Sequence, residues 1–163
     1  MKIGIVMGSD SDLAVMKKAA AVLDEFGLDY EMVIASAHRT PAEVKAFVER
    51  LEAEGAVAFV AGAGAAAHLP GVIASFTTLP VIGVPLNATA LKGMDALLAI
   101  VQMPSGMPVA TMAVDGAKNA ALLAVQIAAT ADAKLRDAYK AYRADMAAKV
   151  IEKNKKLQEE LAK

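Results

Sequence analysis

The amino-acid sequence predicts an α/β fold, with a central parallel sheet that is covered by helices. Short apolar runs of high β-propensity alternate along the chain with longer segments of helical periodicity. The 163 residues are enough for one domain with a real hydrophobic core. Because no repeat or low-complexity linker interrupts them, we expect residues 1–163 to form a single domain.

Five apolar runs are expected to become the strands of the sheet. In chain order they are Lys2–Met7, Tyr30–Ala35, Val57–Ala61, Val81–Val84 and Val109–Val114. Since a helical segment fills each gap between them, the strands should run parallel. We therefore predict a sheet of about five strands.

The first two helices are predicted from their apolar spacing and from their end signals. In the first, Gly27 is the stop after apolar residues at helical spacing, namely Leu13, Met16, Ala20, Leu23 and Phe26. The second covers Ala42–Glu54 and is closed by Gly55. Thr40–Glu43 has the pattern of a capping box, with Pro41 at the first helical position.

Four more helices are predicted further along the chain. A short one over about His68–Ser75 has Pro70 near its start, where proline is tolerated. Another covers about Met94–Val101, and an alanine-rich one, which we expect to be buried, covers Lys118–Ala131. The last, about Lys134–Lys163, carries charges at close intervals, so we expect a solvated tail or an arm that packs on a neighbouring subunit.

Composition excludes several classes of partner. Seventeen Lys and Arg against 18 Asp and Glu give a net charge of −1, so no overall basic surface recruits nucleic acid or an anionic membrane. No apolar stretch reaches the roughly 18 residues of a membrane span. The start, MKIGIVMGSDSD, becomes polar too soon for a signal peptide. Together with the absence of cysteine, these features lead us to expect a soluble, cytoplasmic protein.

The apolar content predicts a homo-oligomer. Hydrophobic residues make up 56% of the chain but aromatic residues only 4%, because much of the apolar content is alanine. So much apolar surface on a small domain suggests that some faces are buried between subunits.

Three turns that follow expected strands carry the polar residues of chemical interest. Gly8–Asp12 follows the first strand, Ser36–Arg39 the second and Ala61–Gly71 the third. The carboxyl ends of parallel strands share one edge of a sheet, where open α/β sheets bind their ligands. In the first turn, Ser9 and backbone amides suit a phosphate and Asp12 suits ribose hydroxyls, although a Ser or Asp N-cap without any ligand explains the motif equally well.

Histidine and arginine in the other two turns extend this candidate site. Arg39 can grip a phosphate with two hydrogen bonds, and His38 can donate or accept a proton near neutral pH. An incidental solvated loop is the alternative for this pair. Gly64 permits close backbone approach to a ligand but equally to a packed helix, and His68 is either a ligand contact or a structural histidine. With two histidines and no cysteine, we expect no metal site.

Six segments together resemble the class I PurE family, N5-carboxyaminoimidazole ribonucleotide mutase. They are GSDSD at 8–12, SAHRTP at 36–41, AGAGAAAHLPG at 61–71, LPVIGVP at 79–85, IVQMPSGMPVAT at 100–111 and KNAALLA at 118–124. The resemblance implies a flavodoxin-like three-layer α-β-α sandwich. It also implies a step of de novo purine synthesis, in which a carboxylate moves from the exocyclic nitrogen of a ribonucleotide to ring C4. A homo-octamer with sites at subunit contacts is implied as well, without metal, ATP or organic cofactor.

The resemblance also assigns roles to individual residues. His38 matches the catalytic histidine. The substrate-binding positions are matched by Ser9, Asp12, Ser36, Arg39, Gly64, His68 and Leu69. Of these, Ser36 and Arg39 match contacts on the phosphate side, and Gly64, His68 and Leu69 match a loop that closes on the base and the migrating carboxylate.

One departure leaves alternatives open. The family usually reads GAGGAAHLPG, but here alanine occupies position 65, which would strain the loop if φ is positive there. The alternatives to the mutase are a class II enzyme that carboxylates aminoimidazole ribonucleotide with CO2, a catalytically impaired or engineered assembly protein that keeps the fold, and a generic flavin- or nucleotide-binding module.

Overall fold

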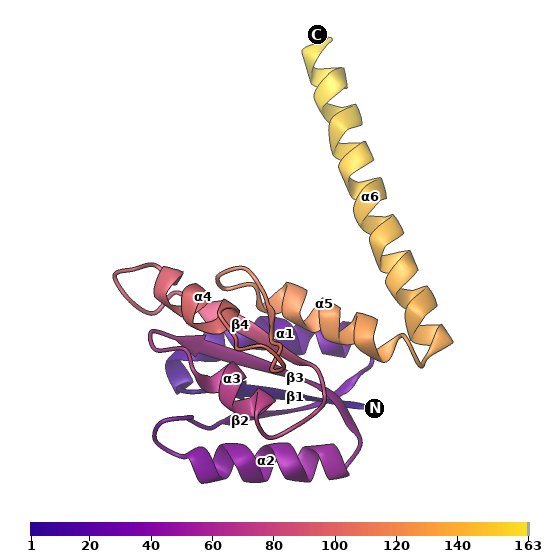
Figure 1. Cartoon of the computed structure of the whole chain (residues 1–163). Helices are drawn as coiled ribbons and strands as arrows, with labels where there is room; N and C mark the ends of the chain where they lie inside the picture. Colours follow the sequence, from indigo (N-terminus) through magenta and orange to yellow (C-terminus); the bar gives the residue numbers. More distant parts are fainter. Residues whose placement is uncertain (163) are drawn as a thin grey trace.

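A five-stranded parallel sheet lies between two layers of helices in the computed structural model, which describes residues 1–162 (Figure 1). The strands are β1 (Lys2–Met7), β2 (Asp29–Ile34), β3 (Ala56–Gly64), β4 (Val81–Leu86) and β5 (Ala110–Thr111). Their order is β2-β1-β3-β4-β5, and every neighbouring pair is parallel. The expected flavodoxin-like three-layer fold is thereby confirmed.

Within residues 1–162, six α-helices cover the sheet or extend from it. They are α1 (Leu13–Glu25), α2 (Pro41–Ala53), α3 (Leu69–Ala74), α4 (Met94–Val101), α5 (Ala117–Ala128) and α6 (Ala133–Leu161), and a short 3-10 turn, η1 (Asp10–Asp12), precedes α1. Buried residues of α1 and α5 pack together on one face of the sheet. Those of α2, α3 and α4 pack on the other. Figure 1 shows α2 and α5 on opposite sides of the strands.

Alternate residues of the central strands supply the two halves of the core. Ile5 of β1 faces the layer of α1 and α5, whereas Val6 faces the layer of α2 and α3. Two glycines allow large side chains to lie against these strands. A Cβ at Gly4 would overlap the Phe59 ring, and a Cβ at Gly62 would overlap the Met16 sulfur. At Gly62, close helix packing is therefore sufficient to explain the glycine.

Four strands differ from their expected bounds, and β3 and β5 differ most. β3 continues to Gly64, because residues 62–64 pair with residues 84–86 of β4 although glycine and alanine have little β-propensity. β5 has only two residues instead of the expected Val109–Val114. Beyond Thr111, the chain follows β4 through separate hydrogen bonds, Met112 N–H to Gly83 O and Asp115 N–H to Pro85 O, rather than through a regular ladder.

The expected capping box at Thr40 is wrong. Pro41 does begin α2, but the Thr40 side chain makes no cap hydrogen bond to that helix. Its Oγ1 instead accepts from the Ser36 N–H at 2.9 Å and donates to the Ser36 carbonyl at 3.3 Å. Thr40 therefore closes the loop between β2 and α2.

The last helix, α6, extends away from the rest of the protein (Figure 1). Leu135 is buried, and Tyr139 and Tyr142 pack against Phe26, which follows α1. Residues 143–162 are all exposed. The expected helix ended at Lys163, which lies outside the described residues. Among residues 1–162, no helix is both long enough and apolar enough to cross a bilayer.

Candidate functional site

A cavity of about 400 Å³ opens at the carboxyl edge of the sheet, over β1 and β3. It lies where the strand order reverses, since β2 lies on one side of β1 and β3 lies on the other. Seven of the eight predicted site residues line it: Ser9, Asp12, Ser36, His38, Arg39, Gly64 and Leu69. The three predicted turns therefore do converge on one cavity.

The turn after β1 is held by hydrogen bonds between its own polar groups. Ser9 caps η1, because its Oγ accepts from the Ser11 N–H at 3.4 Å, while the Asp12 carboxylate accepts from the Ser9 N–H at 3.2 Å. Burial raises the pKa of the Asp12 carboxyl, and hydrogen bonds from Ser11 and Ser9 and the charge of Arg39 oppose that rise. Ser9 is thus an N-cap, and both Ser9 and Asp12 also line the cavity.

Arg39 joins the turn after β2 to the turn after β1. Its Nη2 donates to the Gly8 carbonyl at 2.6 Å, and its Nε donates to Ser36 Oγ at 3.3 Å. Ser36 Oγ also accepts from the backbone N–H of Arg39 at 3.3 Å. These bonds fix the guanidinium plane at the cavity wall and leave N–H groups that can bind an anion.

The two histidines contact each other directly. His38 Nε2 and His68 Nδ1 are 2.7 Å apart, and the rings meet edge to face with centroids 4.9 Å apart. In such a bond one nitrogen donates and the other accepts, so the tautomers of the two rings are linked. His68 is the one predicted site residue that does not line the cavity. It reaches the site through His38.

The loop after β3 places a left-handed alanine in the cavity wall. Ala65 has φ +51°, a conformation that L-residues other than glycine rarely adopt. Two short-range bonds follow it, from the Ala67 N–H to the Ala65 carbonyl and from the His68 N–H to the Ala66 carbonyl, both 2.8 Å. These bonds define the path by which the loop delivers His68 to His38.

A fourth strand-end loop also contributes, and the sequence analysis missed it. Ala88, which follows β4, lines the cavity, and a Cβ added to Gly64 would lie 2.5 Å from the Ala88 Cβ. Gly64 therefore allows two strand-end loops to meet. The signal was available in the sequence, because all parallel strands deliver their carboxyl ends to the same edge. The loop after Leu86 carries no charge or histidine near that edge, so its residue types do not indicate a site.

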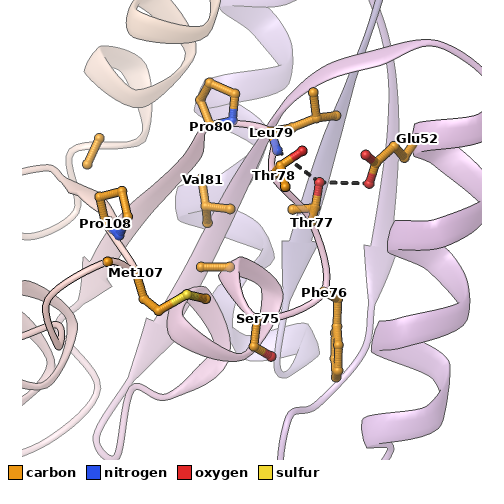
Figure 2. A pocket seen from close by; sticks show the side chains of 13 residues that line it. Glu52, Ser75, Phe76, Thr77, Thr78, Leu79, Pro80, Val81, Met107 and Pro108 are labelled. Carbon is orange, nitrogen blue, oxygen red and sulfur yellow. Dashed lines mark hydrogen bonds between the residues drawn. The ribbon is translucent and has the colours of Figure 1, made fainter.

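A larger cavity, of about 780 Å³, lies at the opposite edge of the sheet, before β4 and β5 (Figure 2). Of the residues that line it, Glu52 alone is charged, and its carboxylate accepts a hydrogen bond from Thr77 Oγ1 at 2.7 Å. Thr77 Oγ1 accepts in turn from the Leu79 N–H at 3.0 Å. Its lining holds no histidine, arginine or lysine, so it lacks a cationic side chain for a phosphate.

Comparisons with known proteins show the family of the chain. Residues 2–149 match the family model described as AIR carboxylase. The chain is 56% identical over 157 residues to the N5-carboxyaminoimidazole ribonucleotide mutase of Pyrococcus horikoshii, covering 96% of this chain and 89% of that protein. It is 50% identical over 158 residues to the mutase of the same name from Thermotoga maritima, covering 97% and 92%.

A solved structure gives the same fold. The crystal structure of Treponema denticola PurE superposes with a TM-score of 0.88 at 33% sequence identity, covering 96% of this chain and 98% of that one. The superposition therefore extends through nearly all of both chains.

Proposed function

The chain belongs to the AIR carboxylase family, and from this premise we propose that it is an N5-carboxyaminoimidazole ribonucleotide mutase of de novo purine biosynthesis. The reaction moves a carboxyl group from the exocyclic nitrogen of the substrate to ring C4. The observation that carries the proposal for this chain is an imidazole, His38, in the wall of a cavity whose other polar groups suit a ribonucleotide.

The nucleotide part of the substrate fits the polar half of the cavity. Arg39 and Ser36 are proposed to bind the phosphate, because the guanidinium is already oriented by Gly8 and Ser36 and can offer its remaining N–H groups. The Asp12 carboxylate is proposed to accept from ribose hydroxyls, with Ser9 beside it. Anchoring the phosphate and ribose would hold the base near His38 and so reduce the entropy cost of the reaction.

His38 is proposed to transfer the proton in both directions. As the bond from nitrogen to the carboxyl carbon breaks, CO2 forms and the nitrogen takes a proton from the His38 imidazolium. Ring C4 then forms a new bond to CO2, and the neutral imidazole removes the C4 proton. The histidine ends in the state in which it began, so one residue acts as general acid and then as general base. No net oxidation occurs, and we propose no cofactor.

The apolar part of the cavity suits the CO2 intermediate. Ala63, Ala65, Leu69 and Ala88 line it with small or aliphatic side chains. Such a wall offers no hydrogen bond to water and would keep CO2 close to C4 until it recombines. Gly64 and Leu69 are therefore proposed to contact the base and the carboxylate. His68 is proposed to act on the substrate through His38 rather than by direct contact.

The left-handed conformation of Ala65 is also consistent with one alternative function. The methyl group of Ala65, in this strained backbone conformation, would reduce the space in which the carboxylate moves. A protein that retains the fold and the assembly but has little or no catalytic activity would also fit this observation.

The proposed assembly is a homo-octamer in the cytoplasm. The chain exposes large apolar side chains at and just before α4 and along α6, among them Leu91, Met94, Val150 and Ile151, at fractions between 55% and 70%. Surface of this kind is usually covered in a subunit contact. We propose that α6 packs on a neighbouring subunit, and that residues 1–162 act as one domain within each subunit.

A substrate test separates the candidate functions. The chain is given either the N5-carboxylated ribonucleotide or aminoimidazole ribonucleotide with CO2, and formation of the C4-carboxylated product is followed. The mutase converts the first compound much faster than the second. Faster conversion of the second would identify a class II carboxylase. Conversion of neither compound by an intact assembly that still binds nucleotide would identify the inactive relative.

A further inference from the structure

We infer that Asp115 is a positioning residue for the reaction, because it holds the loop that supplies part of the apolar wall of the cavity. This loop, called the β4–α4 loop here, covers residues 87–93 and brings Ala88 into the wall. Asp115 lies in the turn after β5 and does not itself line the cavity. The inference rests on the proposed function and extends it to a residue outside the site.

The Asp115 carboxylate binds the first residue of the β4–α4 loop. Its Oδ1 accepts a hydrogen bond from the Asn87 N–H at 3.1 Å. The backbone N–H of Asp115 donates to the carbonyl of Pro85, within β4, at 2.8 Å. Ala88 follows Asn87, and its own N–H makes only a short-range bond, to the Leu86 carbonyl at 3.0 Å. One residue of the neighbouring turn therefore sets the direction in which the chain leaves β4 toward the cavity.

The backbone of Asp115 also indicates a role in the site. Its φ is +57°, which aspartate adopts more readily than most residues but still at a cost. Strained residues persist where their surroundings require them, and they gather at functional sites. Among residues 1–162, the other non-glycine residues with positive φ are Ala65 and Lys92, in the loops after β3 and β4. All three lie in neighbouring loops at the carboxyl edge of the sheet.

The β4–α4 loop is packed between the turn of Asp115 and the loop after β3. At its far end, a Cβ on Gly93 would lie 2.5 Å from a methyl carbon of Val114. At its near end, Ala88 is in contact with Gly64, where an added Cβ would overlap the Ala88 Cβ. With so little space on either side, a shift of the loop changes the wall of the cavity.

The later part of the β4–α4 loop is fixed independently of Asp115. Thr89 Oγ1 donates to Asp95 Oδ2 in α4 at 2.8 Å and accepts from the Leu91 N–H at 3.1 Å. These bonds hold residues 89–91 on the start of α4. Loss of the Asp115 carboxylate is therefore expected to displace Ala88 without unfolding the loop.

A displaced Ala88 would let CO2 escape from the cavity. The apolar wall is proposed to keep CO2 beside ring C4 after the bond from nitrogen has broken. If CO2 leaves before it recombines, aminoimidazole ribonucleotide remains, with the proton from His38 on its nitrogen, and solvent returns a proton to His38. The phosphate and ribose contacts come from other turns, so binding of the nucleotide should change little.

The test gives the full chain the N5-carboxylated ribonucleotide and measures the ratio of aminoimidazole ribonucleotide to C4-carboxylated product. The amount of aminoimidazole ribonucleotide that forms without protein is subtracted. Asp115→Gly removes the carboxylate and tolerates the positive φ, whereas Asp115→Asn keeps an acceptor oxygen and also tolerates it. Asp115 is only partly buried, so both variants should fold, which circular dichroism checks. Thr77→Val is the control, because it removes a side-chain acceptor of a backbone N–H at the opposite edge of the sheet.

Asp115→Gly is expected to raise this ratio at least about threefold, with a KM for the nucleotide within about twofold of the parent value. Asp115→Asn and Thr77→Val should keep the parent ratio. An unchanged ratio in Asp115→Gly, or an equal rise in either of the other variants, would overturn the positioning role and leave the proposed function in place. A parent chain that binds the nucleotide but forms no C4-carboxylated product would overturn the proposed function and the positioning role with it.

Discussion

His38 Nε2 lies 2.7 Å from His68 Nδ1, so the two histidines of the chain form one hydrogen-bonded unit at the edge of the cavity. His38 lines the cavity, whereas His68 does not line it and contacts the His38 ring. The bond links the tautomer of His38 to that of His68, so His68 can influence the proton that a general acid and base must hold and release.

His68→Asn is expected to reduce turnover without abolishing it, by about tenfold, because an amide can replace only part of the hydrogen bond. Since His68 acts through His38, the pH profile of kcat should also shift, whereas KM should change little. Steady-state kinetics between about pH 6 and 9 would show both effects. A raised KM with an unchanged pH profile would instead make His68 a substrate contact.

Ala65→Gly is expected to stabilise the protein by about 1 kcal/mol, because glycine adopts φ +51° without the steric cost that alanine bears. The matched control is Ala66→Gly, whose residue has no positive φ, and it should lose about 0.5–1 kcal/mol through the added freedom of the unfolded chain. Urea denaturation measures both. Equal losses in the two variants would show that position 65 carries no strain. Removing the methyl group should also raise turnover if it narrows the space for the carboxylate.

Asp12→Asn is expected to weaken nucleotide binding and yet leave stability at neutral pH unchanged or higher. Burial raises the pKa of this carboxyl, so its charged form costs stability above that pKa, and the cost disappears when an amide takes its place. Calorimetric titration with the nucleotide and thermal unfolding at neutral pH provide the two readouts. Asp10→Asn in the same turn is the control, since Asp10 does not line the cavity. A marked loss of stability in Asp12→Asn would contradict this account of the carboxylate.

Acid should weaken a cluster of ion pairs far from the site. Hydrogen bonds from Arg50 lower the pKa of the Glu31 carboxyl on β2, and hydrogen bonds from Lys2 and Arg50 lower the pKa of the Glu54 carboxyl. A lowered pKa in the folded state adds stability above the unfolded value of about 4.5, and this stability is lost as the pH falls through the folded pKa.

Glu31→Gln should therefore flatten the decline in stability below about pH 4.5 and cost little, because the pair is exposed. Glu49→Gln, whose carboxylate lies 3.6 Å from Lys45 on the surface of α2, is the matched control and should leave the decline as it is. Thermal unfolding at a series of pH values makes the comparison. Identical acid profiles for Glu31→Gln and the parent chain would exclude the Arg50 cluster as a source of the decline.

Most of the fold could be predicted because hydrophobic periodicity decides it. β1 and α4 begin and end at the predicted residues, and the remaining elements were found in the right order. β5 was overestimated, since Val109–Val114 has the composition of a strand but only two of its residues form a ladder. β3 was underestimated, since its last residues are glycine and alanine and are held by pairing with β4 instead of by propensity.

The sequence predicts that the site lies at the carboxyl ends of the strands. It does not predict the contacts between the side chains there. Parallel topology brings the turns at Ser9, Ser36 and Gly64 together, and the sequence reveals that topology. It does not reveal that Thr40 bonds back to Ser36 or that His68 meets His38, because both depend on loop paths with no periodic pattern. The left-handed backbone of Ala65 could be suspected only by comparison with the glycine that the family has there.

The claim that His38 carries the proton is tested most directly by a single-turnover measurement on the N5-carboxylated ribonucleotide, comparing the parent chain with His38→Asn at saturating nucleotide. We expect the parent to form the C4-carboxylated product, and His38→Asn to bind the nucleotide with similar affinity but to react at least about 100-fold more slowly. A His38→Asn variant that bound and converted the substrate as fast as the parent would contradict the proposed mechanism.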